Sequence, residues 1–251
     1  RLALYGHNTG PDLVGNPRLF VDPQGKEHIV APHEGGYHNN AMTIGGGTRV
    51  YGAQAWRFHP EDFRMASIYG VPNGSSLADW PISYDELAPY YERAEWEIGV
   101  SGPDSVNTRR AARQRGYPMP PVSDNPQRLI LSRGAERLGW GSAPVPLLIN
   151  SQPYQGRMAC VQCGLCVGFA CPSEAKNGSH NTAIPRALAT GNCTLLPESQ
   201  ASHIQTDDKG VVTGVEIVRE ENGAIVRKSV RAKKVIVSGG AIESARLLLN
   251  S

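Results

Sequence analysis

Four cysteines within twelve residues constrain this chain more than any other feature: Cys160, Cys163, Cys166 and Cys171. Thiolates that lie this close along a chain can share one metal centre, and a segment whose side chains wrap around a common centre must be a loop. The spacing therefore predicts a cysteine loop over residues 160–171. The fifth cysteine, Cys193, lies too far along the chain to join without folding back, and we expect it in the core.

Three interpretations of the cysteine loop stay open. An iron–sulfur cluster is the first, because the first two gaps and the final proline follow the C-x₂-C-x₂-C-x₃-C-P pattern of bacterial ferredoxins, although the last gap is one residue longer. A structural zinc with four thiolates is the second, although the usual pair of separated C-x₂-C knuckles is missing. The third is a metal-free loop with disulfides or buried thiols. The first two make the four cysteines the candidate metal ligands.

A second motif is the glycine loop (residues 44–52), which carries Gly45, Gly46 and Gly47 in succession. Backbone without side chains can lie against a flat or anionic ligand, and its N–H groups can form an anion nest. A flexible turn without a ligand is the alternative, because glycine runs are common in loops. The sequence contains no G-x-G-x-x-G, so the usual pyrophosphate fingerprint does not decide between the two.

Composition excludes several classes of protein. The 251 residues are 40% hydrophobic with a net charge of +2, which supports a real core and does not favour nucleic acid or an anionic membrane surface as a partner. No apolar run is long enough to cross a bilayer. We expect a cytoplasmic protein, with a periplasmic location as the alternative. The chain starts without methionine and ends inside an apolar helical pattern, so we expect a piece of a longer polypeptide.

Periodicity predicts helices in the first two thirds of the chain. A helix is expected over residues 85–97, with Ser83 and Glu86 as a capping box, and its acidic residues Glu92, Glu95 and Glu97 on a solvated face. Further helices are expected over residues 126–138 and 181–188, and residues 101–124 read as a polar surface linker.

The last third of the chain reads as strands. A β-meander is expected, followed by a fully buried strand over residues 234–238, whose β-branched residues run without polar breaks. Gly239 and Gly240 then turn the chain into a final helix, and strand, small-residue turn and helix is the geometry of a dinucleotide-binding layer. The meander strands are expected over residues 194–196, 202–205, 211–218 and 224–228.

Two stretches resemble the glucose–methanol–choline (GMC) oxidoreductases. Residues 40–51 (NAMTIGGGTRVY) resemble the flavin-binding signature of that family, and residues 55–58 (AWRF) are similar to its sugar dehydrogenase branch. Residues 235–248 (VIVSGGAIESARLL) resemble its strand–turn–helix beside the flavin. The resemblance begins near residue 37. In sugar dehydrogenases of this kind a cysteine loop holds an iron–sulfur cluster that passes electrons onward, and the match over residues 160–171 is looser.

The resemblance implies an FAD-dependent oxidoreductase that oxidises CH–OH groups of a sugar or other alcohol by hydride transfer to the flavin. Tyr51 stands where some sugar oxidases join a histidine to the flavin, so we expect non-covalent FAD. The catalytic base stays unassigned, because the family's catalytic histidines have no match here. The cofactor-binding residues that the resemblance implies are Asn40, Gly45, Gly46, Gly47, Thr48, Arg49, Val50, Tyr51, Gly52, Ala201, Gly239, Gly240 and Ala241.

The implied fold class is α/β (α+β), an FAD-binding dinucleotide fold of the GMC type in part, with the β-meander and part of a substrate-binding region. We expect a flavin-contacting segment over residues 1–100, a linker, helix and cysteine loop over 101–193, and the meander with its strand–turn–helix over 194–251. Expected partners are a sugar or alcohol substrate, the rest of the same protein or a complementary chain, and an electron acceptor. The alternative function is an iron–sulfur or zinc module for electron transfer or structure, without catalysis of its own.

Overall fold

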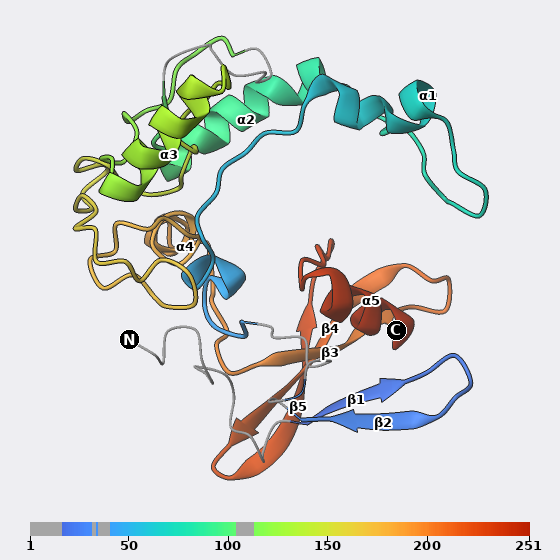
Figure 1. Cartoon of the computed structure of the whole chain (residues 1–251). Coiled ribbons are helices and arrows are strands. Elements are labelled where there is room, and N and C mark those ends of the chain that lie inside the picture. Colours follow the sequence, from blue (N-terminus) through green and yellow to red (C-terminus); the bar gives the residue numbers. More distant parts are fainter. Residues whose placement is uncertain (1–16, 32–33, 35–40, 104–112) are drawn as a thin grey trace. The chain divides into compact units, whose positions relative to one another are not determined.

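The computed structural model describes residues 17–31, 34, 41–103 and 113–251, in two compact units, 1–190 and 191–251. The elements of each unit are labelled in Figure 1. The first unit holds β1 (Arg18–Val21), β2 (Glu27–Val30), the 3₁₀ helices η2 (Gly46–Arg49) and η3 (Pro60–Arg64), α1 (Met65–Tyr69), α2 (Tyr84–Ile98), α3 (Pro126–Arg137) and α4 (Ala183–Ala189). The second unit holds β3 (Gln200–Thr206), β4 (Val212–Glu221), β5 (Ala224–Arg231) and α5 (Ala241–Leu249).

Helix α2 begins where the capping box predicts. The Ser83 hydroxyl accepts the amide of Glu86 at 3.2 Å, and the Glu86 carboxylate accepts the amide of Ser83 at 2.7 Å. These two bonds satisfy amides that the first turn of a helix leaves without partners. The predicted helix over residues 85–97 is confirmed to within one residue at each end.

One acidic residue of α2 contradicts the expected solvated face. Glu95 is 6% exposed, and Arg57 binds its carboxylate with two hydrogen bonds, of 2.9 and 2.8 Å. Arg113 donates to both oxygens of the same carboxylate. A buried carboxylate needs such partners because its desolvation is costly, so Glu95 holds the segments before and after α2 against the helix.

The core of the first unit is built mainly by extended segments that lack regular strands. Residues near 53, 101, 148 and 176 exchange backbone hydrogen bonds, among them Leu148 N to the Ala53 carbonyl at 2.7 Å and Asn177 N to the Leu148 carbonyl at 2.8 Å. Ala53, Val100 and Ile149 are buried within this arrangement. The backbone groups of a buried loop must find partners, and these mutual bonds supply them.

The expected surface linker over residues 101–124 is contradicted at Ser101 and Met119. Ser101 is fully buried and exchanges backbone hydrogen bonds of 2.8 Å with Leu147. Met119 is 1% exposed, and its carbonyl accepts the amide of Gly102 at 3.0 Å. The polar and proline-rich composition predicted a surface segment. In the structure Ser101 and Met119 are buried and hydrogen-bonded, and they attach the segment to the core. Residues 104–112 lie outside the described part of the chain.

The second unit is an antiparallel sheet in the order β3-β4-β5, with α5 against it. Ile204 of β3 and Leu247 of α5 are its buried apolar residues, and the Ser251 hydroxyl accepts the Ile204 amide at 2.8 Å. The meander is therefore confirmed for three of its four strands, because residues 194–196 are not in a strand.

The buried strand expected over residues 234–238 is also absent from the structure. Ile236 is 89% exposed. A strand that is buried on both faces needs flanking strands and covering layers, and none of the described strands pairs with this segment. The helix that follows is confirmed, as α5 begins at Ala241 after Gly240 with φ 88°.

Candidate functional site

The glycine loop folds into a tight turn and the short helix η2. Gly45 and Gly46 have φ values of 93° and 53°, a left-handed conformation that favours glycine. The Gly46 amide donates to the Thr43 carbonyl at 2.7 Å, and the Thr48 hydroxyl donates to the Gly45 carbonyl at 2.5 Å. The run of glycines is therefore an ordered turn in the structure and not a slack linker.

The glycine loop has a packed side and an open side. A Cβ added to Gly45 would lie 2.8 Å from the Cβ of His180, closer than real Cβ atoms approach. A Cβ added to Gly47 would meet no atom of the protein within 4 Å, and Gly47 is exposed. Gly45 thus serves the packing of the chain, whereas Gly47 leaves bare backbone available to a ligand.

Arg49 adds charge at the end of η2. Within the described residues its guanidinium has no ion-pair partner, although it is partly buried. The guanidinium lowers the pKa of His180 further, after the larger effect of burial, so His180 is held neutral. An arginine without a carboxylate partner in the described structure, close to the exposed backbone of Gly47, is a chemical setting for an anion such as a phosphate.

His180 fills the space behind the glycine loop. Its ring lies against Gly45 and Gly178, and its Nδ1 atom is buried without a hydrogen-bond partner in the described structure. Both glycines are needed there, because a Cβ on Gly178 would lie 2.9 Å from Nδ1 and 2.6 Å from the Thr48 hydroxyl. The ring is enclosed by the protein itself, so it supports the shape of the loop.

Tyr51 is anchored inward. Its hydroxyl donates to the Asn177 carbonyl at 2.5 Å, and burial raises its pKa. Asn177 is fully buried, and its side-chain amide donates to the Gly99 carbonyl at 2.7 Å and to the Asn150 side chain at 2.8 Å. The side chain of Tyr51 is therefore occupied within the protein. Its backbone is occupied too, because its amide donates to the Gly47 carbonyl at 3.0 Å and its carbonyl accepts from Lys176 at 3.0 Å.

Sequence reasoning missed Lys176, which joins the two motifs. The side chain is 1% exposed, and its ammonium donates to the carbonyls of Tyr51 at 3.0 Å, Phe169 at 2.9 Å and Cys166. A lysine in a single sequence normally indicates a surface position. No local pattern distinguishes this one, apart from its place directly after the cysteine loop.

The structure does not assemble the four cysteines into a metal site. No group of three or more His, Cys, Asp or Glu side chains among the described residues is arranged to hold a metal ion. Cys163 is exposed, and the other three are partly buried thiols that form no disulfide. The four cysteines therefore stay predicted metal ligands on the ground of their spacing, and the described residues do not confirm them. Cys193, expected in the core, is exposed, because burial depends on tertiary neighbours that its sequence position does not reveal.

The thiols of the cysteine loop differ in their environments. Burial raises the pKa of Cys166, and the nearby Cys160 adds to the effect. Burial opposes ionisation of Cys171 as well, but hydrogen bonds from Ser173 and from the amides of Lys176, Ser173 and Ala175 outweigh it and lower its pKa. Backbone amides, together with the Ser173 side chain, therefore surround the Cys171 thiol with hydrogen-bond donors.

The remaining predicted cofactor residues lie in the second unit or outside the description. Ala201 lies in β3 opposite Ile217 of β4. Gly239 donates its amide to the Ser244 hydroxyl at 2.9 Å, and a Cβ on Gly240 would meet no atom within 4 Å. The backbone at Gly240, directly before α5, therefore has no described neighbour where a side chain would begin. Asn40 lies outside the described residues.

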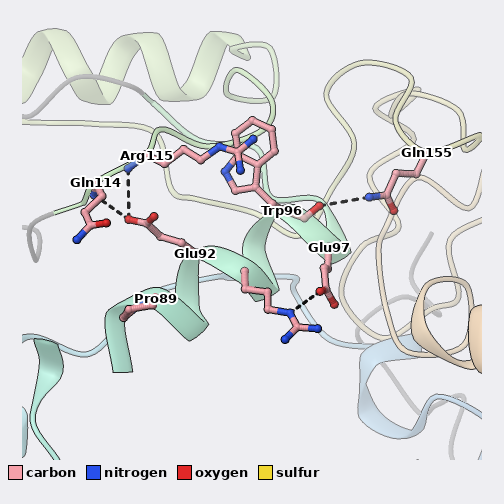
Figure 2. Close-up of a pocket in the computed structure, with 8 residues that line it drawn as sticks. Pro89, Glu92, Trp96, Glu97, Gln114, Arg115 and Gln155 are labelled. Carbon is pink, nitrogen blue, oxygen red and sulfur yellow. Dashed lines mark hydrogen bonds and ion pairs between the residues drawn. The ribbon is translucent and has the colours of Figure 1, made fainter. Parts of the chain in front are cut away.

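A pocket against α2 is a separate feature (Figure 2). Its volume is about 470 Å³. The Glu92 carboxylate accepts a hydrogen bond from the backbone amide of Gln114 at 2.7 Å. Arg93 forms an ion pair with Glu97 at 2.6 Å, and the Arg115 guanidinium lies over the ring of Trp96. These polar groups already satisfy each other, so we do not place the cofactor there. The lining residues are Pro89, Glu92, Arg93, Trp96, Glu97, Gln114, Arg115 and Gln155.

Comparison with known proteins extends the resemblance seen in the motifs. The family model for GMC oxidoreductases matches residues 37–251. The chain is 34% identical to 6'''-hydroxyparomomycin C oxidase of Streptomyces lividus over 86% of its length and 38% of the relative's. It is 32% identical to paromamine 6'-oxidase of Streptomyces fradiae, over 98% of this chain and 44% of the relative. It is 33% identical to the fructose dehydrogenase large subunit of Gluconobacter japonicus, over 95% of this chain and 42% of the relative.

The extent of these matches decides what they show. The chain spans less than half the length of these curated relatives. Within the described residues, no helix has both the length and the apolar character to cross a membrane. The family match covers most of the chain and includes both the glycine loop and the turn into α5. The chain therefore belongs to the GMC oxidoreductase family.

Proposed function

We propose that the protein is an FAD-dependent oxidoreductase that oxidises a CH–OH group of a sugar or other alcohol. Its family supports the class of reaction, and the names of its relatives, which include oxidases of paromamine and 6'''-hydroxyparomomycin C and a fructose dehydrogenase, support the class of substrate. Bound FAD would accept a hydride from the carbon that carries the hydroxyl group.

The observation that carries the proposal is the open side of the glycine loop. Gly47 is exposed, and no atom of the described residues lies within 4 Å of the place its Cβ would take. Arg49 provides a cation without a carboxylate partner in the described structure. In this proposal residues 45–52 hold the non-covalent cofactor by backbone contact, and Arg49 balances phosphate charge. The family resemblance also proposes Gly239, Gly240, Ala241 and Ala201, in the second unit, as cofactor-binding residues.

Gly47→Val tests this proposal directly. A valine there meets no protein atom at its Cβ, so the protein should fold normally, but its side chain should occupy the cofactor's place. We expect loss of bound FAD, measured by flavin absorbance in the purified protein, with a melting temperature close to that of the wild type.

Gly134→Val is the matched control for that variant. Gly134 lies in α3, and a Cβ there also meets nothing within 4 Å. This variant should keep the FAD content of the wild type. Full FAD occupancy in Gly47→Val would remove the glycine loop from the cofactor site.

No observation favours the alternative function of an iron–sulfur or zinc module. The four cysteines do not form a metal-holding group in the described structure. Iron and zinc analysis of the purified protein checks this point independently of the flavin.

A further inference from the structure

The buried ammonium of Lys176 is the contact between the glycine loop and the cysteine loop. Its hydrogen bonds reach Tyr51, at the end of the glycine loop, and both Cys166 and Phe169 in the cysteine loop. These acceptors are backbone carbonyls, so the contact fixes the path of the chain and not one side-chain rotamer. Lysine is the side chain that offers three donors on one atom, which is what three converging carbonyls require.

The charge of Lys176 is costly where it lies. Its hydrogen-bond partners in the described structure are neutral carbonyls, and no carboxylate pairs with it. Burial of an ion without good partners costs several kcal/mol. Burial lowers the pKa of Lys176, and the neighbouring thiols of Cys166, Cys171 and Cys163 oppose this effect. The hydrogen bonds of Lys176 hold the two loops together, and this interaction offsets the cost of burying its charge.

Other bonds join the same three stretches of chain. The Gly168 amide donates to the Val50 carbonyl at 2.8 Å, and the Tyr51 hydroxyl donates to the Asn177 carbonyl at 2.5 Å. A Cβ on Gly52 would lie 3.5 Å from the side chain of Val167. Residues 50–52, 166–169 and 176–177 therefore interlock, with Lys176 donating to two of these stretches from the third.

We propose that Lys176 is a positioning residue of the cofactor site, which holds the cysteine loop as a brace behind the glycine loop. This role rests on the proposed function. Val50 and Tyr51 continue directly from η2, so a bond that fixes the Tyr51 carbonyl also fixes the direction in which Gly47 presents its open side. The cysteine loop then serves as a structural support whose task is carried by its backbone carbonyls.

Lys176→Met tests the role, with Arg157→Met as the matched control. Arg157 is another partly buried cation that donates to neutral oxygens, at the Asn177 side chain and the carbonyls of Ile98 and Asn181. These hydrogen bonds reach neither the glycine loop nor the cysteine loop, and only the bond to Asn177 reaches one of the interlocking stretches. Both variants are compared with the wild type for melting temperature, for the FAD dissociation constant by flavin fluorescence, and for the rate at which the half-buried thiols react with a disulfide reagent.

We expect both variants to melt at lower temperature, but only Lys176→Met to alter the site. Its FAD dissociation constant should rise at least about tenfold, because a displacement on the order of 1 Å is enough to weaken a positioned site by that factor. The half-buried thiols of Cys160, Cys166 and Cys171 should also react at least about tenfold faster, because their loop is released. Exposed Cys163 and Cys193 should react at unchanged rates.

Four outcomes overturn the role. An unchanged FAD dissociation constant in folded Lys176→Met, or equal effects in Lys176→Met and Arg157→Met, would make Lys176 an ordinary stabilising residue. A wild-type protein that binds no FAD would instead overturn the proposed function, and with it this role. If Lys176→Met does not fold, Lys176→Gln keeps two donors and should show the same changes to a smaller degree, and wild-type values in that variant would contradict the role.

Discussion

At the scale of single residues, Gly45 and Gly47 are separated only by Gly46 but have opposite tasks. Gly45 is enclosed by His180 and has a left-handed backbone, whereas Gly47 is open and has none of these restrictions. A substitution at Gly45 therefore acts on folding, and one at Gly47 acts on ligand contact. The two effects are separable by experiment because the neighbouring atoms are so different.

Gly45→Ala should destabilise the protein by about 2 kcal/mol, from the cost of a left-handed alanine and from the contact with His180. Gly74→Ala is the control, since Gly74 has φ 77° but no atom within 4 Å of its Cβ. Denaturant unfolding of both variants separates the two causes. Equal loss of stability in the two variants would mean that His180 moves aside without cost.

Single residues were also where prediction from sequence was least complete. The three glycines indicated close backbone approach to a ligand, which stays a prediction; Gly45 and Gly46 have a left-handed backbone in the structure. Lys176 was missed, because a lone lysine carries no signal of burial and its acceptors lie up to 125 residues away along the chain. Cys193 was expected in the core and is exposed, because hydrophobic character alone does not tell which residues find neighbours.

At the scale of elements, α2 shows which features a local pattern can determine. Its capping box and its end at Gly99 depend on residues within the helix or next to it, and both were predictable. Burial of Glu95 depends on Arg57 and Arg113, which approach from outside the helix. The segment over residues 234–238 failed as a prediction for the same reason, since a strand exists only with a hydrogen-bonded neighbour.

Glu95→Gln should cost about 3–5 kcal/mol of folding stability, because it leaves two guanidinium groups without their shared buried anion. Glu97→Gln is the control on the same helix, as Glu97 is partly exposed and pairs with exposed Arg93. Thermal melting should show a large loss for the first variant and little change for the second. Similar melting temperatures would show that Arg57 and Arg113 find other partners.

At the scale of the whole molecule, surface carboxylates in both units stabilise the folded state at pH values above those at which carboxylates take up protons. Hydrogen bonds, chiefly, lower the pKa of these groups below the ordinary values of 3.8 for Asp and 4.5 for Glu. The unfolded chain then binds more protons as the pH falls, so acid favours unfolding. The groups are Asp22, Asp79, Glu86, Glu97, Glu216 and Glu221.

The melting temperature should therefore fall as the pH decreases below about 4.5, since the stabilisation is complete above the unfolded-state pKa and is lost through the lower folded-state values. Glu86→Gln removes one of these groups and should reduce the steepness of the decline. Melting curves between pH 6 and pH 3 check both statements. A melting temperature that holds or rises over that range would contradict the direction of these pKa shifts.

The ring of carbonyls around Lys176 has a consequence for how the protein is made. Tyr51 leaves the ribosome 125 residues before the lysine that holds its carbonyl, and closing so large a loop is entropically unfavourable and slow. The nascent chain therefore carries an unbraced glycine loop until Lys176 has been synthesised, and we expect the proposed cofactor site to form only after that point.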